Sequence, residues 1–149
     1  MREMRRDMLR LAEARIIVDH ALRHARDHGF PPMTVAVLDG GGQLIAFARE
    51  DESSLLREKI ARAKAMSALN MGTGTRTLAQ RAEHHPHFIN AITTLAEGEI
   101  IPVPGGVLVR DPESGKVIGA VGVSGHRPDE DEACAVHGIR AAELAADTG

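Results

Sequence analysis

The chain has 149 residues, of which 43% are hydrophobic and 26% charged, and its formal net charge at pH 7 is −3. This length is typical of one domain, so we expect a single domain over residues 1–149. The acidic balance argues against nucleic acid, which needs a basic surface. No apolar run approaches the roughly 20 residues of a membrane-spanning helix. We therefore expect neither nucleic acid nor a membrane among the partners.

The N-terminus and the single cysteine both indicate a cytoplasmic protein. Met1–Asp7 mixes charges of both signs and no apolar signal region follows, so we expect no secretory signal unless the chain shown begins at a mature residue. Cys134 has no partner for an internal disulfide, which fits a reducing compartment. It lies among alanines in a predicted helix, where a free cysteine is usually a small buried hydrophobe.

The first predicted element is a helix over residues 4–28, ended by Gly29 and by the two prolines that follow. Its apolar residues recur at three- and four-residue spacing and form one stripe. Ile16 lies well outside this stripe, and His20 is next to it around the helix. His24 lies between that second face and the edge of the stripe. A second, partly apolar face indicates that both sides of the helix are covered, as in a homo-oligomer.

Two strands and two helices are expected next. Residues 33–38 and 43–48 are short apolar runs joined by an Asp-Gly-Gly-Gly turn, which predicts a hairpin whose first strand is covered on both faces. A helix capped by Ser53 or Ser54 follows, with Lys64 at the edge of its apolar stripe, and a capping box at Thr77 predicts another. Residues 88–92 fit either a helix or a strand.

A second hairpin, of residues 101–110 and 116–125, precedes a final helix that Asp129 is expected to cap. Pro102 and Pro104 cannot donate ladder hydrogen bonds, so their segment should lie at an edge or a bend. The resulting order is α-β-β-α-α-β-β-α. Adjacent hairpins among helices predict an antiparallel sheet in an α+β domain.

Five segments in this order resemble the GlcG/HbpS family, which includes the C-terminal domain of PduO-type corrinoid adenosyltransferases. They are residues 37–42, 61–65, 104–106, 119–125 and 131–133, and the resemblance extends from about residue 10 to residue 145. It implies a profilin-like domain with a five-stranded antiparallel sheet, assembled into homo-oligomers such as octamers. Several members bind heme through a histidine of the N-terminal helix region. Relatives often have a second glycine where His126 follows Gly125 here.

Histidine is the first candidate for chemistry. His20, His24 and His28 are four residues apart and lie along one line of the first helix. A neutral imidazole can ligate heme iron axially, so His20 and His24 are the proposed ligands of this cofactor and its metal. The alternative is a polar surface line near the helix end. His84, His85 and His87 lack a recognised zinc spacing, and His137 is expected to be a packed or surface residue.

Lys64 is the second candidate. Its side chain either snorkels to solvent or, if buried, acts as a base, an amine nucleophile or a carboxylate anchor. In the second case the protein is a small enzyme acting on a carboxylate or carbonyl metabolite, with His126 or Glu132 as the acid/base partner. Four acidic residues at 129–132 exclude a phosphate site at the last glycine of the second hairpin. Pro104, Gly105 and Gly106 form a rigid edge that could line a small-molecule pocket.

Overall fold

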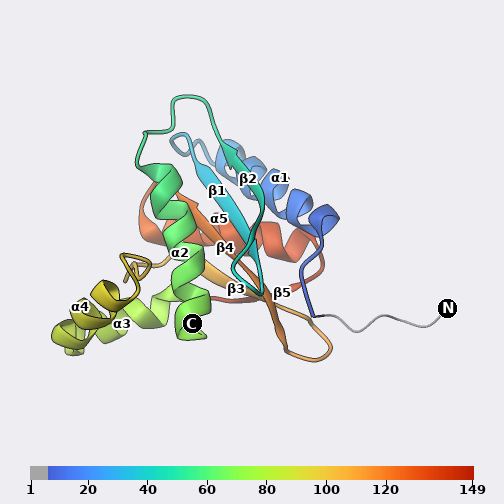
Figure 1. Cartoon of the computed structure of the whole chain (residues 1–149). Coiled ribbons are helices and arrows are strands. Elements are labelled where there is room, and N and C mark those ends of the chain that lie inside the picture. Colours follow the sequence, from blue (N-terminus) through green and yellow to red (C-terminus); the bar gives the residue numbers. More distant parts are fainter. Residues whose placement is uncertain (1–6) are drawn as a thin grey trace.

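A computed structural model describes residues 7–149 of the chain, as a sheet with helices packed on both faces (Figure 1). The helices and strands, in chain order, are α1 (Leu11–Asp27), β1 (Thr34–Asp39), β2 (Leu44–Arg49), α2 (Arg57–Met71), α3 (Thr75–His84), α4 (Pro86–Leu95), β3 (Gly106–Arg110), β4 (Val117–Ser124), α5 (Pro128–Ala141) and β5 (Ala145–Asp147). No helix in this part of the chain has the length and apolarity to cross a membrane.

The five strands pair in the order β2-β1-β4-β3-β5, and every pairing is antiparallel. The two predicted hairpins adjoin through β1 and β4, where Val37 lies opposite Val121. All residues of β1 except its last are buried, as expected for a strand covered on both faces. The α+β class and the five-stranded antiparallel sheet are confirmed. The short strand β5 has no sequence signal of its own.

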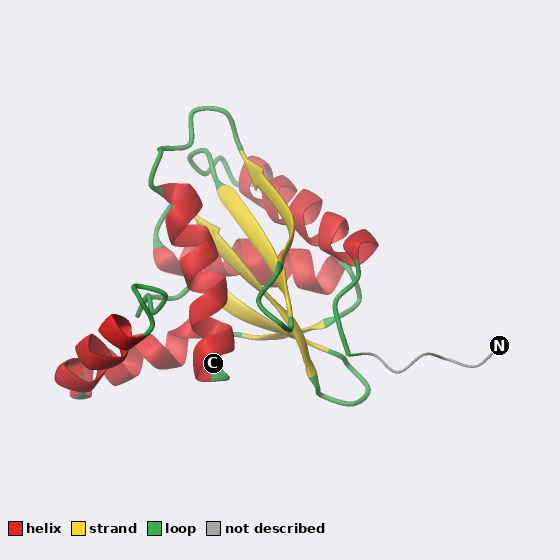
Figure 2. Cartoon of the chain, viewed as in Figure 1, coloured by secondary structure: helices red, strands yellow, loops and turns green. Residues whose placement is uncertain are grey.

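Helices α1 and α5 cover one face of the sheet, and α2 covers the other (Figure 2). Alternate residues of β1 point to opposite faces. Val35 and Val37 therefore pack with Ile17 of α1 and Ile139 of α5, whereas Leu38 packs with Ala65 of α2. The larger core lies on the α1/α5 side.

Glycines in the sheet let α2 lie directly on the strand backbone. A Cβ atom at Gly122 would lie 1.8 Å from the carbonyl oxygen of Ala61, and one at Gly106 would lie 2.2 Å from that of Lys64. Neither position tolerates a side chain. Glycine inside a strand is typical of such a close approach by another backbone.

Several boundaries differ from those predicted. Helix α1 begins at Leu11, and residues 7–10 before it are not helical; the predicted start at residue 4 lies outside the described residues. The amide of Leu9 donates to the carbonyl of Ile118 at 3.0 Å and its side chain is buried, which fixes this segment against β4. Likewise β3 begins only at Gly106, because the preceding prolines keep residues 101–105 out of the ladder.

The helix starts also shift, each for a local reason. The hydroxyl of Ser53 is hydrogen-bonded to Thr34 at 2.8 Å instead of capping α2, which begins at Arg57. Proline occupies the first turn of both α4 and α5, where its missing N–H costs nothing. Helix α5 therefore begins at Pro128 rather than after an Asp129 cap. The ambiguous segment 88–92 is helical, as part of α4.

Candidate functional site

Four histidines meet where α1 packs against α5, and we call this group the histidine seam: His20 and His24 of α1, His28 directly after its end, and His137 of α5. The ring of His24 lies at the centre of the seam. Its centroid is 4.1 Å from that of His28 and 4.9 Å from that of His137. The rings of His20 and His137 are 6.3 Å apart.

Two further rings extend the seam. Phe30, just beyond α1, meets His24 edge-on with centroids 6.0 Å apart, and the ring of His126 lies 5.0 Å from that of Phe30. His20, His24, Phe30 and His126 are each half-buried, whereas His28 and His137 are exposed. The result is a continuous run of flat side chains from α1 to the loop before α5.

The close approach of the two helices depends on Gly138. A Cβ atom there would lie 2.4 Å from the carbonyl oxygen of Ile17, so only glycine lets α5 pack this tightly on α1. Its neighbour His137 is thereby carried to the α1 histidines. The four-residue spacing of His20, His24 and His28 along α1 and its C-cap supplies the other three rings. The sequence predicted His20 and His24 as a pair, but nothing in it placed His137 beside them.

Burial lowers the pKa of His24, and the nearby His28 and His137 lower it further, against the opposite effect of Asp27 and Glu130. The central imidazole therefore stays neutral, with one nitrogen lone pair available, at lower pH than an ordinary histidine. His28 is held differently, because its Nδ1 lies 2.8 Å from the carbonyl oxygen of His24.

Among residues 7–149, no three histidine, cysteine or carboxylate side chains are placed to hold a metal ion. A metal site built from protein side chains alone needs three or four such ligands. Heme differs in this respect, since its porphyrin supplies four ligands and the protein adds only one or two axial ones. Half-buried imidazoles flanked by aromatic rings fit that requirement.

Lys64 and Asp131 form a second, buried cluster. The Nζ atom of Lys64 lies 2.9 Å from Oδ2 of Asp131 and donates to the carbonyl of Val123 at 3.0 Å. The other carboxylate oxygen accepts the amide of His126 at 2.8 Å. Burial lowers the pKa of Lys64 and raises that of Asp131, while each charge opposes the shift of the other. Lys64 is thus buried rather than snorkelling.

The three residues proposed for catalysis do not converge. Glu132 binds Arg76, with 2.9 Å between its Oε1 and the guanidinium, and Asp129 joins the same ion cluster. The imidazole of His126 faces Phe30, and only its backbone amide reaches Asp131. The carboxylate that contacts Lys64 therefore belongs to Asp131 and not to Glu132. Successive residues of a helix point in different directions, so the two side chains diverge.

Gly105 and Gly106, at the start of β3, cover the lysine. Gly105 has a φ of +122°, and a Cβ atom there would lie 2.7 Å from Nζ of Lys64. The hydroxyl of Thr75 accepts the amide of Gly106 at 2.9 Å and fixes this backbone. Pro104 enters the segment half-buried. The glycine segment therefore packs directly on Lys64, and its part in lining a pocket stays a prediction.

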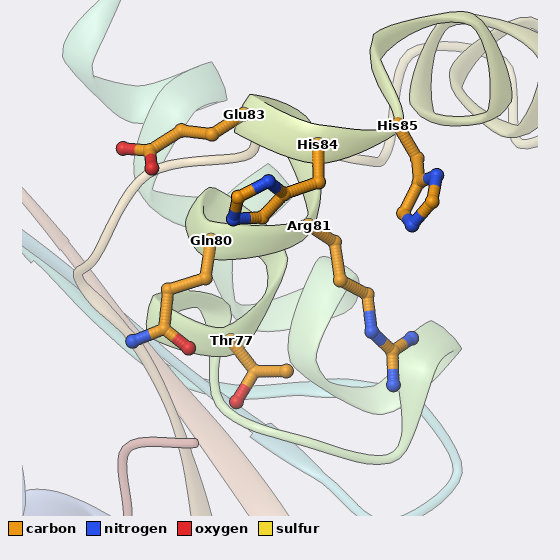
Figure 3. A pocket seen from close by; sticks show the side chains of 6 residues that line it. All are labelled: Thr77, Gln80, Arg81, Glu83, His84 and His85. Carbon is orange, nitrogen blue, oxygen red and sulfur yellow. The ribbon is translucent and has the colours of Figure 1, made fainter.

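His84 and His85 lie elsewhere, at a hollow of about 380 Å³ on α3. Figure 3 shows that it is lined along one helix by Thr77, Gln80, Arg81, Glu83 and the two histidines. All but Thr77 are exposed. The two histidines thus lie at the exposed end of α3.

Comparison with known proteins places the chain in a family. Residues 9–140 match the family described as haem-degrading, HbpS-like proteins, so the chain belongs to the HbpS-like family. The family resemblance seen in the sequence is confirmed. None of the curated proteins compared with the chain matches it.

Solved structures share the fold over nearly the whole chain. A PduOC–heme complex has a TM-score of 0.83 at 22% identity, covering 93% of this chain and 97% of that one. The ORFY protein of Klebsiella pneumoniae has a TM-score of 0.83 at 26% identity, with coverage of 96% and 97%. HbpS has a TM-score of 0.77 at 25% identity, with coverage of 94% and 92%. Heme or small-ligand binding is thus supported at the level of the family.

Proposed function

We propose that this protein binds heme at the histidine seam, as a homo-oligomer in the cytoplasm, with His24 or His20 as the iron ligand. The observation that carries the proposal is the seam itself, in which His24 is half-buried between two other imidazoles and the ring of Phe30. The family match and the similar PduOC–heme complex support it.

The seam suits heme in two respects. A porphyrin is broad, flat and largely apolar, and flat side chains stack favourably on such a surface. Axial ligation needs a neutral imidazole, and the lowered pKa of His24 keeps that form present near neutral pH. When bound, the iron would supply the redox and ligand-binding chemistry, whereas His20 and His24 would orient the group and Phe30 would shield one edge from water.

Hemin titration of the purified protein tests this proposal. We expect a saturable shift of the Soret band that is lost in the His20→Ala/His24→Ala double variant and kept in a matched His84→Ala/His85→Ala variant on α3. The single variants identify the ligand. The proposal fails if hemin gives no Soret shift, or if the double variant in α1 binds as the unchanged protein does.

A second function, catalysis on a carboxylate or carbonyl metabolite, is favoured by one observation. Buried ionisable pairs with shifted pKa values, such as Lys64 and Asp131, occur often at active sites. Against it, the amine already contacts two acceptors and lies under Gly105, so substrate access would require the pair to open. His126 and Glu132 would then have to approach from neighbouring positions.

Turnover of a heme analogue or a metabolite by a Lys64→Met variant separates the two functions. An enzyme that uses this amine loses turnover while its hemin-induced Soret shift is unchanged. If turnover of an identified substrate continues at the original rate in Lys64→Met, Lys64 takes no part in catalysis.

A further inference from the structure

Most of the buried polar side chains in the described part of the chain gather at one end of the sheet, where β1 begins and β4 ends. Thr34 and Ser124 lie opposite each other on these two strands, and both are fully buried. The hydroxyl of Ser53 is 2.8 Å from that of Thr34. The buried pair of Lys64 and Asp131 lies at the same end of β4. Because burying polar groups is costly, such a cluster is typical of a binding site.

Arg57, the first residue of α2, reaches into this cluster. Its Nη1 atom donates to the hydroxyl of Ser124 at 3.0 Å. Alternate residues of β4 face α2, so Ser124 shares the face of Gly122, on which Ala61 of α2 packs. Arg57 is four residues from Ala61 and therefore lies on the sheet-facing side of the helix. The guanidinium is thus held beside the end of β4.

Both groups of this contact have unused hydrogen-bond donors. A guanidinium carries several N–H donors. The bond to Ser124 is the only side-chain hydrogen bond or ion pair of Arg57 within residues 7–149. Ser124 accepts that bond, and its own hydroxyl proton has no acceptor in the same part of the chain. Arg57 is half-buried, so solvent reaches it. The ligand that fits these donors is an acceptor.

The charges of the cluster define the sign of that ligand. Lys64 and Asp131 together are neutral, whichever of the two holds the proton. Arg57 is therefore the uncompensated charge. Its charge also reaches the pair: burial lowers the pKa of Lys64, Asp131 opposes this effect, and Arg57 lowers the pKa further. An ion with a single negative charge balances Arg57.

The geometry of the guanidinium favours a carboxylate. Arginine binds a carboxylate through two parallel N–H···O bonds, because its planar fork matches the two oxygens. Ser124 occupies Nη1 of Arg57, whereas Nε and Nη2, which form such a fork, have no acceptor among the described residues. A phosphate group would bring a second negative charge that nothing in the cluster balances.

We propose that Arg57 and Ser124 bind the carboxylate of a small organic acid at the end of β4, beside Lys64 and Asp131. The inference rests on the second function proposed above and names the residues that anchor its substrate. It concerns binding alone, so it is tested without turnover.

Titration with acetate, the simplest such carboxylate, tests the site by nuclear magnetic resonance in a carboxylate-free buffer. We expect saturable shifts of the Arg57 Nε–H and Gly125 amide signals, and no such shifts with chloride at equal ionic strength. Arg57→Gln should raise the dissociation constant for acetate about tenfold or more, because charged hydrogen bonds are lost. Arg57→Lys keeps the charge without the fork and should also weaken binding, as should Ser124→Ala.

Two controls complete the experiment. Arg62→Gln makes the matched change on the exposed side of α2 and should leave the acetate dissociation constant unchanged. Circular dichroism melting shows that each variant is folded. Hemin provides a further comparison, since its propionates are also carboxylates, and we expect Arg57→Gln to keep the hemin-induced Soret shift.

The outcomes separate this site from the proposed functions. The site is wrong if acetate gives no saturable shift, if chloride acts as acetate does, or if Arg57→Gln binds acetate as the unchanged protein does. It is also wrong if Arg57→Gln weakens hemin binding alone. Loss of turnover in Lys64→Met without acetate binding would keep the second function and reject this site. Acetate binding without turnover of any acid would keep the site and reject catalysis.

Discussion

Lys64 of α2 and Asp131 of α5 are 67 residues apart in the sequence and form an ion pair of 2.9 Å. Their side chains are only 3% and 1% exposed. The two helices cover opposite faces of the sheet, so the pair joins the two layers of the domain at the end of β4. The carbonyl of Val123 in β4 also accepts a hydrogen bond from Lys64.

Removing one partner of this pair leaves the other charge buried without compensation. We expect Lys64→Met to lower the free energy of unfolding by about 3–5 kcal/mol. Lys64→Met/Asp131→Leu should recover much of this loss, because no buried charge remains. Urea unfolding of both variants checks the prediction, with Lys59→Met on the exposed side of α2 as the control. Equal losses in the single and double variants would contradict it.

Gly122 is the tightest point between α2 and the sheet. A methyl group there would overlap the carbonyl oxygen of Ala61, which is helix backbone and cannot turn aside. We expect Gly122→Ala to destabilise the protein by about 3 kcal/mol. The control is Gly40→Ala, where the nearest atom is the flexible Met8 sulfur at 3.4 Å. Thermal unfolding that ranked the two variants equally would mean that α2 can move off the sheet.

Cys134 is fully buried, and burial, with the nearby Asp131 and Glu130 charges, raises the pKa of its thiol from 9.0 to about 12. The folded protein should therefore resist thiol reagents at pH 8 and react only after unfolding. Because the folded-state pKa is the higher one, the stability contributed by the protonated thiol is complete below pH 9 and is lost as pH rises towards 12.

The matched experiment for Cys134 compares urea unfolding of the unchanged protein and Cys134→Ala at pH 8 and pH 10. The unchanged protein should lose more stability between these pH values than the variant does. Rapid labelling of native Cys134 at pH 8, or identical pH dependence in the two proteins, would show that the thiol is not shielded.

Arg76 joins the start of α3 to the first two turns of α5 through Asp129 and Glu132. The guanidinium and Asp129 are substantially exposed, so solvent screens much of the interaction. We expect Arg76→Gln to cost about 1 kcal/mol at low ionic strength and less in about 1 M salt, where screening is strong. Arg62→Gln should have no effect at either salt concentration. Urea unfolding at the two ionic strengths measures both.

Local signals were sufficient for much of the fold. The Asp39 turn forms as its residue types predict, with the Asp39 carboxylate accepting the amides of Gly41 and Gln43, and Gly29 ends α1 with a positive φ of 66°. Continuous apolar runs identified β1 and β4, as expected for strands covered on both faces. Strand β5 was missed because its three residues carry no periodicity and form a strand only by pairing with β3.

The candidate site was predicted only in part, for a physical reason. Spacing along one helix places His20 and His24 together, since it depends only on helix geometry. The position of His137 depends on how closely α5 approaches α1, which Gly138 decides through a tertiary contact. Which carboxylate contacts Lys64 likewise depends on how α5 is rotated about its axis. Asp131 and Glu132 are adjacent in the sequence, and only the tertiary packing of α5 decides that Asp131 faces Lys64.

His126 connects the two clusters of this protein. Its ring lies against Phe30 at the histidine seam, and its amide is hydrogen-bonded to the same carboxylate that holds Lys64. Any molecule that displaces the His126 ring must therefore either rotate that side chain alone or pull on Asp131. If the movement pulls on Asp131, ligand binding at the seam also disturbs the ion pair with Lys64 of α2. The rate of amide hydrogen exchange at His126 would then change when the ligand binds.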